Sequence, residues 1–275
     1  EGDRITRGRQ PAGAILMREL DAITALLVRD LRSFFRSRSQ LYSSVFFPLM
    51  LLAILGVGVE DGLDPRNIDD YVTFLTPGMI VMTALFSSTF SSASYYQDRD
   101  SGLLRVMIAS PHSPQVILLG KALAGVTIGG VQALALLLVA AAIPSINFHW
   151  QYGVPGSIAL TAFAVVLLNL FLSGLGQMLA SRIRSMQGFH LVMNLVLFPF
   201  LFFSGAFFPL DELPIWLKLL GRINPLSYGV DLMHLSLYAE SSDGYFGVPV
   251  DLAVLTLVAA AVFYAGTSRS TSLER

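Results

Sequence analysis

Long runs without any charged residue constrain this chain more than any other feature. Ala122–Ser181 contains no Asp, Glu, Lys or Arg, and neither does Tyr71–Gln97 upstream of it. A helix needs about 20 mainly apolar residues to cross a bilayer, and backbone polar groups in hydrocarbon must be bonded internally. Only 13% of the residues are charged, against roughly 25% in soluble domains. The sequence therefore predicts an all-α polytopic membrane protein.

Six apolar segments are long enough, or almost long enough, to cross a membrane, and we interpret residues 1–275 as a single transmembrane domain. The predicted spans are residues 41–59, 71–97, 116–143, 157–181, 189–210 and 252–268. Residues 211–238 hold apolar stretches that are too short to cross. We expect short re-entrant or interfacial helices there, before the last span.

The distribution of basic residues predicts the orientation. Six spans place both termini on one side, and of the 18 Lys and Arg residues only Arg66, Lys218 and Arg222 then fall on the other side. Basic residues concentrate in the cytoplasmic segments of membrane proteins. We therefore expect a protein of the cell membrane with both termini and Gln97–Pro114 in the cytoplasm, and with residues 211–251 outside.

Ala14–Arg38, within the N-terminal cytoplasmic region 1–38, has the pattern of a basic amphipathic helix. Apolar residues recur every three or four positions along one face, and Arg29, Arg32 and Arg36 step along another. The segment is too charged to span, so we expect it to lie in the membrane interface. A helix of a soluble domain is the alternative.

Gln97–Pro114 is a short charged segment between two long apolar runs, so it belongs at a membrane face. We expect a small amphipathic helix in which Asp98 and Asp100 lie at the N-terminus and Leu104 on an apolar face. Such a helix either docks on a partner or lies in the lipid headgroups. The residues proposed for contact with a partner are Asp98, Asp100, Gly102, Leu103, Leu104, Met107, Ser110 and Pro111. Replacing Leu104 with Asp is expected to uncouple the partner without unfolding the spans.

A polar stripe runs along the predicted span 157–181, where Asn169, Ser173 and Gln177 are four residues apart. Buried amides in a membrane must find partners, so the stripe faces protein or a water-filled cavity. Packing between helices is the favoured reading. A translocation path is the alternative, to which Asn194 and Phe198 in the fifth span would also contribute.

Several kinds of chemistry have no residues to support them. Gly120-Lys121 lacks the earlier glycine of a Walker A phosphate loop, so we expect no nucleotide hydrolysis on this chain. Cysteine is absent and the four histidines have no metal-ligand spacing, so no metal site is predicted. A net charge of −1 gives no sign of nucleic-acid binding. Because the predicted spans carry no carboxylates, an ion pump or sodium extrusion is disfavoured.

Several motifs together resemble the ABC-2 type permease family, the membrane subunits of bacterial and archaeal ABC exporters. The first cytoplasmic loop matches in Asp100–Leu104, Ser110-Pro111 and the following Gly120-Lys121. The more specific match lies in residues 203–231 and includes Gly205, Pro209, Asn224, Pro225, Tyr228 and Asp231. Where relatives often continue with a basic residue, this chain has Met233-His234, which leaves the role of His234 open.

The resemblance implies one half of an exporter. Two permease copies, identical or closely related, would pair with two separate ATPase subunits that carry ATP and Mg²⁺, with no cofactor on this chain. Gln97–Pro114 would be the coupling helix in the ATPase cleft, and Ala14–Arg38 the interface helix beside it. The expected cargo is an amphiphilic drug or lipid. A polysaccharide or lipid-linked glycan is the alternative, and a secondary transporter is a more distant one, since inverted repeats are not visible.

Overall fold

The computed structural model describes residues 12–60, 68–109, 112–143, 146, 148–238 and 245–273. Within these residues the fold is all-helical, and an isolated bridge between His149 and Tyr238 is its one β-type pairing. The helices are α1 (Ala12–Arg36), α2 (Arg38–Glu60), α3 (Ile68–Asp100), α4 (Leu103–Ile108), α5 (Pro114–Ala141), α6 (Gly153–Ala180), α7 (Met186–Phe202), the 3₁₀ helix η2 (Leu210–Glu212), α8 (Ile215–Ile223), α9 (Pro225–Leu237) and α10 (Val248–Leu273).

Four of these helices are long and apolar enough to cross a membrane. The qualifying segments are Tyr71–Asp100 in α3, Gln115–Ala141 in α5, Gly153–Ala180 in α6 and Val248–Gly266 in α10. They coincide with four of the predicted spans, because charge-free runs of this length satisfy the hydrogen bonds of their own backbone as helices. The prediction of an all-α multi-pass membrane protein is confirmed to this extent.

The other two predicted spans differ from the expectation. The axis turns by 90° between α1 and α2, and the bent pair Met17–Arg36 and Gln40–Leu55 counts as at most one further span. Helix α7 has 17 residues, fewer than the roughly 20 that cross a bilayer. The predicted boundary 189–210 was too long, since the helix ends at Phe202 and Gly205 adopts a left-handed φ of 84°. The count of six spans stays a prediction.

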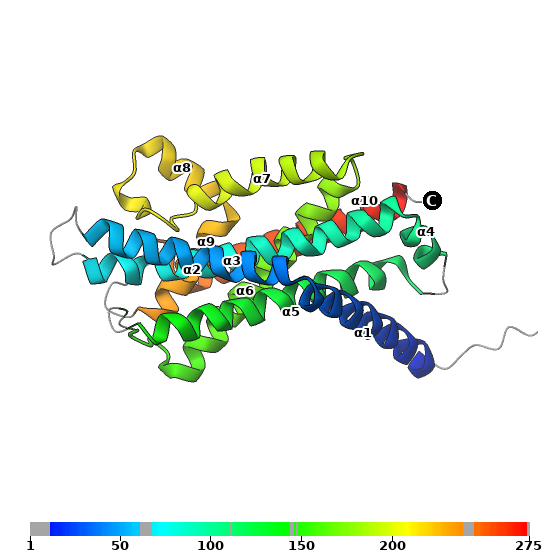
Figure 1. The fold of residues 1–275 in the computed structure, drawn as a ribbon, viewed down its shortest axis with the longest axis horizontal. Helices are drawn as coiled ribbons and strands as arrows, with labels where there is room; N and C mark the ends of the chain where they lie inside the picture. Colours follow the sequence, from blue (N-terminus) through cyan, green and yellow to red (C-terminus); the bar gives the residue numbers. More distant parts are fainter. Residues whose placement is uncertain are drawn as a thin grey trace, which may run out of the picture.

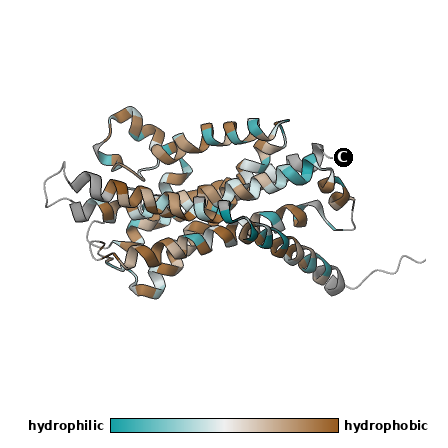
Figure 2. Cartoon of the chain, viewed as in Figure 1, coloured by the Kyte–Doolittle hydropathy of each residue, from teal (hydrophilic) through white to brown (hydrophobic). Residues whose placement is uncertain are grey.

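Helix α3 lies at the centre and contacts α2, α5, α6, α7 and α9, while α10 packs along α6 (Figure 1). Apolar residues dominate the long helices, whereas hydrophilic ones alternate with them along α1 (Figure 2). The short helix α4 and the C-terminal end of α10 lie at one end of the bundle, and α8 lies at the other (Figure 1). The predicted short helices in residues 211–238 are present as α8 and α9. Their re-entrant position in a membrane remains a prediction.

Candidate functional site

The predicted coupling segment folds differently from the expectation at its start. Helix α3 continues to Asp100, so Asp98 and Asp100 end this long helix and do not begin the short one. Helix α4 begins after Gly102, where a φ of 78° changes the direction of the chain. The first turn of α4 holds no acidic residue. A glycine adopts such a left-handed conformation without steric cost. Two of the predicted contact residues, Ser110 and Pro111, lie outside the described residues.

The apolar residues of α4 divide into an anchor and an outward face. Leu104 is 0% exposed and belongs to the core, whereas Leu103 is 41% and Val106 is 68% exposed. Met107 and Ile108 are partly buried against the core. Leu103 and Val106 are therefore available to a partner. Leu104 is not, and replacing Leu104 with Asp would bury a charge and disturb the fold as well as any docking.

An ion cluster around a fully buried lysine joins α1, α3 and α5. Lys121 is 0% exposed, and its Nζ lies 2.5 Å from Oδ2 of Asp98 and 3.5 Å from Oδ2 of Asp30. It also donates to Oγ of Ser94 at 3.0 Å. Arg29 contacts the same two carboxylates, at 2.5 Å for Asp98 and 2.8 Å for Asp30. We call Arg29, Asp30, Asp98 and Lys121 the ion cluster.

The ion cluster is balanced in charge, which explains why it can be buried. Taking one ion out of water costs several kcal/mol, and close opposite charges with further hydrogen bonds offset that cost. Two cations meet two carboxylates here, and neither carboxylate is left without a cation. Burial alone lowers the pKa of Arg29, but hydrogen bonds to Asp98 and Asp30 outweigh it and raise this pKa, so the guanidinium stays charged.

Helix α1 contacts both sides of the α4 segment. Before α4, the ion cluster ties α1 to Asp98. After α4, Glu19 Oε1 accepts a hydrogen bond from the backbone N–H of Ser113 at 3.2 Å. A Cβ placed on Gly120 would lie 3.2 Å from Cβ of Leu26, so glycine permits the close approach of α5 to α1. Gly120-Lys121 thus has a structural role. The glycine allows α1 to pack closely on α5, and the lysine forms ion pairs with Asp30 of α1 and Asp98 of α3.

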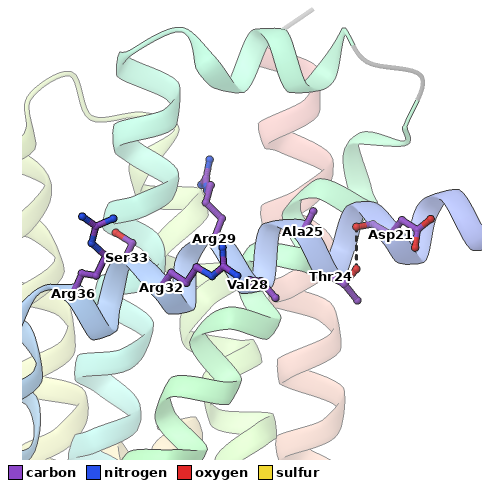
Figure 3. A pocket seen from close by; sticks show the side chains of 8 residues that line it. All are labelled: Asp21, Thr24, Ala25, Val28, Arg29, Arg32, Ser33 and Arg36. Carbon is purple, nitrogen blue, oxygen red and sulfur yellow. Dashed lines mark hydrogen bonds between the residues drawn. The ribbon is translucent and has the colours of Figure 1, made fainter.

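The remaining predicted residues of α1 face outward. Arg32 and Arg36 are exposed and line a groove of about 800 Å³ along α1 together with Arg29 (Figure 3). Arg29 is also a member of the ion cluster, paired with Asp30 and Asp98. The arginines therefore divide into one that holds the helix in place and two that remain available to a partner or to lipid.

The polar stripe of α6 lies inside the bundle, against α3 and α5. Asn169, Ser173 and Gln177 are each at most 1% exposed. Oδ1 of Asn169 accepts a hydrogen bond of 2.6 Å from Ser87 on α3. A Cβ on Gly129 of α5 would lie 2.5 Å from Nδ2 of the same asparagine. These contacts favour helix packing over a translocation path, as small residues and amides do between membrane helices.

Substituting Gly129 tests this packing. Gly129→Ala is expected to destabilise the bundle by about 1–3 kcal/mol, since overpacking a filled interface costs this much, and the added Cβ would collide with Asn169 and Ser87. Gly130→Ala is the matched control, because a Cβ there meets nothing within 4 Å. Thermal unfolding of both purified variants compares them. Equal midpoints would contradict the close contact between α5 and α6.

The structure does not bring Asn194 and Phe198 to that stripe. Both lie on α7 and are exposed, Phe198 by 44%. Leu191 and Leu195 are exposed on the same helix, by 67% and 69%. The candidate path residues therefore form two separate groups, one buried in the bundle and one on the outside of the described chain.

The residues that resemble the family signature form the turns at the other end of the bundle. Oδ1 of Asn224 accepts from the N–H of Leu226 as the N-cap of α9, and Nδ2 of Asn224 donates to the carbonyl of Phe200 in α7. Pro225 occupies the first position of α9, and Pro209 precedes η2. The hydroxyl of Tyr228 donates to the carbonyl of Arg222. These residues shape the connection between α7 and α9. His234, in the last turn of α9, stacks on Phe74 of α3.

Sequence reasoning missed Asp30, Ser94 and Lys121 as members of one site. Their positions are separated by up to 91 residues in the chain. One signal was available: Lys121 is the last charged residue before a run of 60 uncharged ones. A lysine at that position either reaches the interface or finds a carboxylate.

Comparison with known proteins supports one family. The profile of the ABC-2 type transporter family matches residues 21–238. The probable multidrug ABC transporter permease YbhR of Escherichia coli K12 is 29% identical over 166 residues, which cover 59% of this chain and 43% of YbhR. Nodulation protein J of Rhizobium leguminosarum bv. trifolii is 29% identical over 189 residues, 68% of this chain and 69% of that protein. Nodulation protein J of Rhizobium meliloti 1021 is 28% identical over 222 residues, which cover 75% of this chain and 82% of that protein. Since the family profile covers more than half of its length, the chain belongs to the ABC-2 type transporter family.

Proposed function

We propose that this chain is the permease subunit of an ATP-driven exporter that moves an amphiphilic, drug- or lipid-like substrate out of the cytoplasm. The single observation that carries the proposal is α4, which exposes Leu103 and Val106. It packs on α3 and α5, which Lys121 and Asp98 of the ion cluster join to each other. Exposed apolar residues on a rigid support suit docking to another protein. The partner would be a separate ABC ATPase, which would supply ATP and Mg²⁺.

The ion pairs between α1, α3 and α5 suggest how the ATPase would act on the membrane helices. Closing of an ATPase pair on ATP would displace α4, which packs on α3 and α5. Lys121 and Asp98 join these two helices, and Arg29 joins them to α1. Three helices would therefore move together with the docking segment. ATP drives such a shift only through its higher affinity for one of two conformations. Two permease copies, identical or paralogous, would enclose the pathway between them.

The proposed orientation places α4 in the cytoplasm and the turn before α6 outside. Because the chain has no cysteine, single cysteines report the side of each segment. In intact cells, an impermeant maleimide is expected to label Tyr152→Cys at the start of α6. Ser101→Cys, at the opposite end of the bundle, is expected to react only after permeabilisation. Both native residues are exposed. The reverse pattern of labelling would invert the topology.

The substrate class is proposed from the outer face of α7 and from the name of one relative. Leu191, Leu195, Phe198 and Phe202 give α7 an exposed apolar surface, which suits an amphiphile entering from the side. YbhR is named as a multidrug permease. Export of a polysaccharide or lipid-linked glycan is the second candidate, favoured if aromatic rings such as Phe198 line the pathway. In a reconstituted complex, stimulation of ATP hydrolysis by a lipophilic dye supports the first, and stimulation by a lipid-linked oligosaccharide alone supports the second.

Purification of the tagged chain from its native host in mild detergent tests the proposal. Mass spectrometry is expected to find a subunit with a Walker A sequence in near-stoichiometric amount. The Lys121→Met variant, which removes one cation of the ion cluster, is expected to retain less of this ATPase subunit. Recovery of the chain alone, even after crosslinking in native membranes, would favour a secondary transporter.

A further inference from the structure

The outer face of α1 carries two arginines whose charges are not balanced by the fold. Arg32 and Arg36 are exposed and line the C-terminal end of the groove along α1 (Figure 3). Their neighbour Arg29 pairs with Asp30 and Asp98. Within the part of the chain that the structure describes, neither Arg32 nor Arg36 forms an ion pair. Docking through α4 does not use these two charges.

The spacing of the two arginines favours an anion between them. Arg32 and Arg36 are four residues apart, so their side chains are neighbours on the helix, and like charges at this spacing destabilise it. Among the described residues that line the groove, Asp21 is the one carboxylate. It precedes Arg32 by 11 residues, about 16 Å along a helix axis. Charges interact over roughly 8 Å at physiological ionic strength, so Asp21 is too far away to balance the pair.

The position of α1 beside α2 indicates that this anion is a membrane lipid. Helix α2 has no charged residue between Arg38 and Glu60, and it exposes Phe46 by 64% and Ile54 by 56%, as a helix in contact with lipid does. The axis turns by 90° between α1 and α2. With α2 in the bilayer, α1 therefore runs along the membrane surface, as basic amphipathic helices do. Arg36 ends α1 at the level of the lipid phosphates.

We propose that Arg32 and Arg36 bind the phosphate of an anionic phospholipid at the cytoplasmic surface of the membrane. Guanidinium groups bind phosphate oxygens through paired, charge-assisted hydrogen bonds, and the hydroxyl of Ser33 in the same groove adds a donor. Val28 is 40% and Phe35 is 50% exposed on α1, and both would contact the acyl chains. The cationic group of a zwitterionic headgroup would be repelled by the two arginines, so the site selects lipids with a net negative charge.

The bound lipid would hold the same part of α1 that carries the ion cluster. Arg29 lies three residues before Arg32, and its guanidinium joins α1 to Asp98 of α3. An anionic lipid would thus fix the end of α1 against the membrane while Arg29 fixes it against the bundle. This inference requires α2 in the membrane, and it does not depend on an ATPase that docks on α4.

Native mass spectrometry of the purified full-length chain, incubated with equal amounts of phosphatidylglycerol and phosphatidylcholine, tests the site. The wild-type chain is expected to retain phosphatidylglycerol preferentially. Replacing both arginines, Arg32→Gln with Arg36→Gln, is expected to weaken this binding by about tenfold or more, since basic side chains attract anionic lipid individually. Arg182→Gln with Arg184→Gln is the matched control. It removes the same charge from two exposed arginines after α6 and is expected to keep the preference.

Three results would overturn the proposal. Equal retention of the two lipids by the wild-type chain would exclude a selective site, and this result needs no variant to fold. An equal loss in both double variants would show a general effect of charge. Displacement of phosphatidylglycerol by excess inorganic phosphate would indicate a site for a free anion. If Arg32→Gln with Arg36→Gln keeps the lipid preference but loses a bound ATPase, the groove binds protein instead, and the lipid site is likewise contradicted.

Discussion

Replacing Lys121 with methionine is expected to lower the free energy of unfolding by about 3–5 kcal/mol, the usual loss when one partner of a buried ion pair is removed. Methionine fills a similar volume, so the loss arises from charge. Asp98 would keep only Arg29 as a cation, and both carboxylates would remain buried. Scanning fluorimetry of the purified chain, with Trp150 and Trp216 as the intrinsic signal, measures the shift in midpoint.

Two further variants separate charge from packing. Lys218→Met on α8 removes a lysine that is not fully buried, and it is expected to change the midpoint little. Adding Asp98→Asn to Lys121→Met leaves Arg29 and Asp30 as a balanced pair, and it should recover at least half of the loss. A double variant that is no better than Lys121→Met alone would show that the ion cluster does not act through charge balance.

Replacing Val106 with aspartate is expected to weaken binding of the ATPase by at least about tenfold, with coupled transport falling in parallel. An unpaired charge buried at an interface costs more than the roughly 1–3 kcal/mol of a neutral group left without a hydrogen bond, and each 1.4 kcal/mol corresponds to about tenfold in affinity. Val106 is 68% exposed in the isolated chain, so the fold itself should tolerate the charge. Titration of the purified ATPase onto the permease in nanodiscs measures the affinity.

The control variants separate docking from folding. Val106→Thr keeps the shape of the side chain and is expected to retain most of the affinity. Leu104→Asp is expected to lower the unfolding midpoint, since Leu104 is 0% exposed, whereas Val106→Asp is not. Unchanged affinity and transport in Val106→Asp would show that α4 does not contact the ATPase through this face.

The long membrane helices could be predicted from the sequence because their cause is local. A charge-free run such as Ala122–Ser181 allows few alternatives to membrane helices. The end of α7 is harder, since Phe203–Leu210 is as apolar as the helix before it. The helix stops at Phe202 because Gly205 turns the chain and Asn224 caps the α7 carbonyl of Phe200, and that cap comes from 24 residues further on.

The start of α4 was predicted wrongly for a related reason. Asp98 and Asp100 look like N-terminal residues of a helix, because acidic residues there favour the helix dipole. At the C-terminus of α3 the same dipole disfavours them, and Asp98 is stabilised there by Lys121 and Arg29. Arg29 is 69 residues away from Asp98 in the chain. Ion pairs over such distances leave no periodicity in the sequence, so the partners of Lys121 could be identified only in the folded structure.

Crosslinking from a single cysteine at position 106 in native membranes tests most directly whether α4 docks on an ATPase. The chain has no other cysteine, so a photoactivatable maleimide on Val106→Cys reports on that position alone. The account predicts one main product, in which mass spectrometry identifies a subunit with a Walker A sequence, and no such product from Tyr152→Cys at the opposite end. Crosslinks from position 106 to lipid only, or equal capture of the ATPase from position 152, would contradict the account.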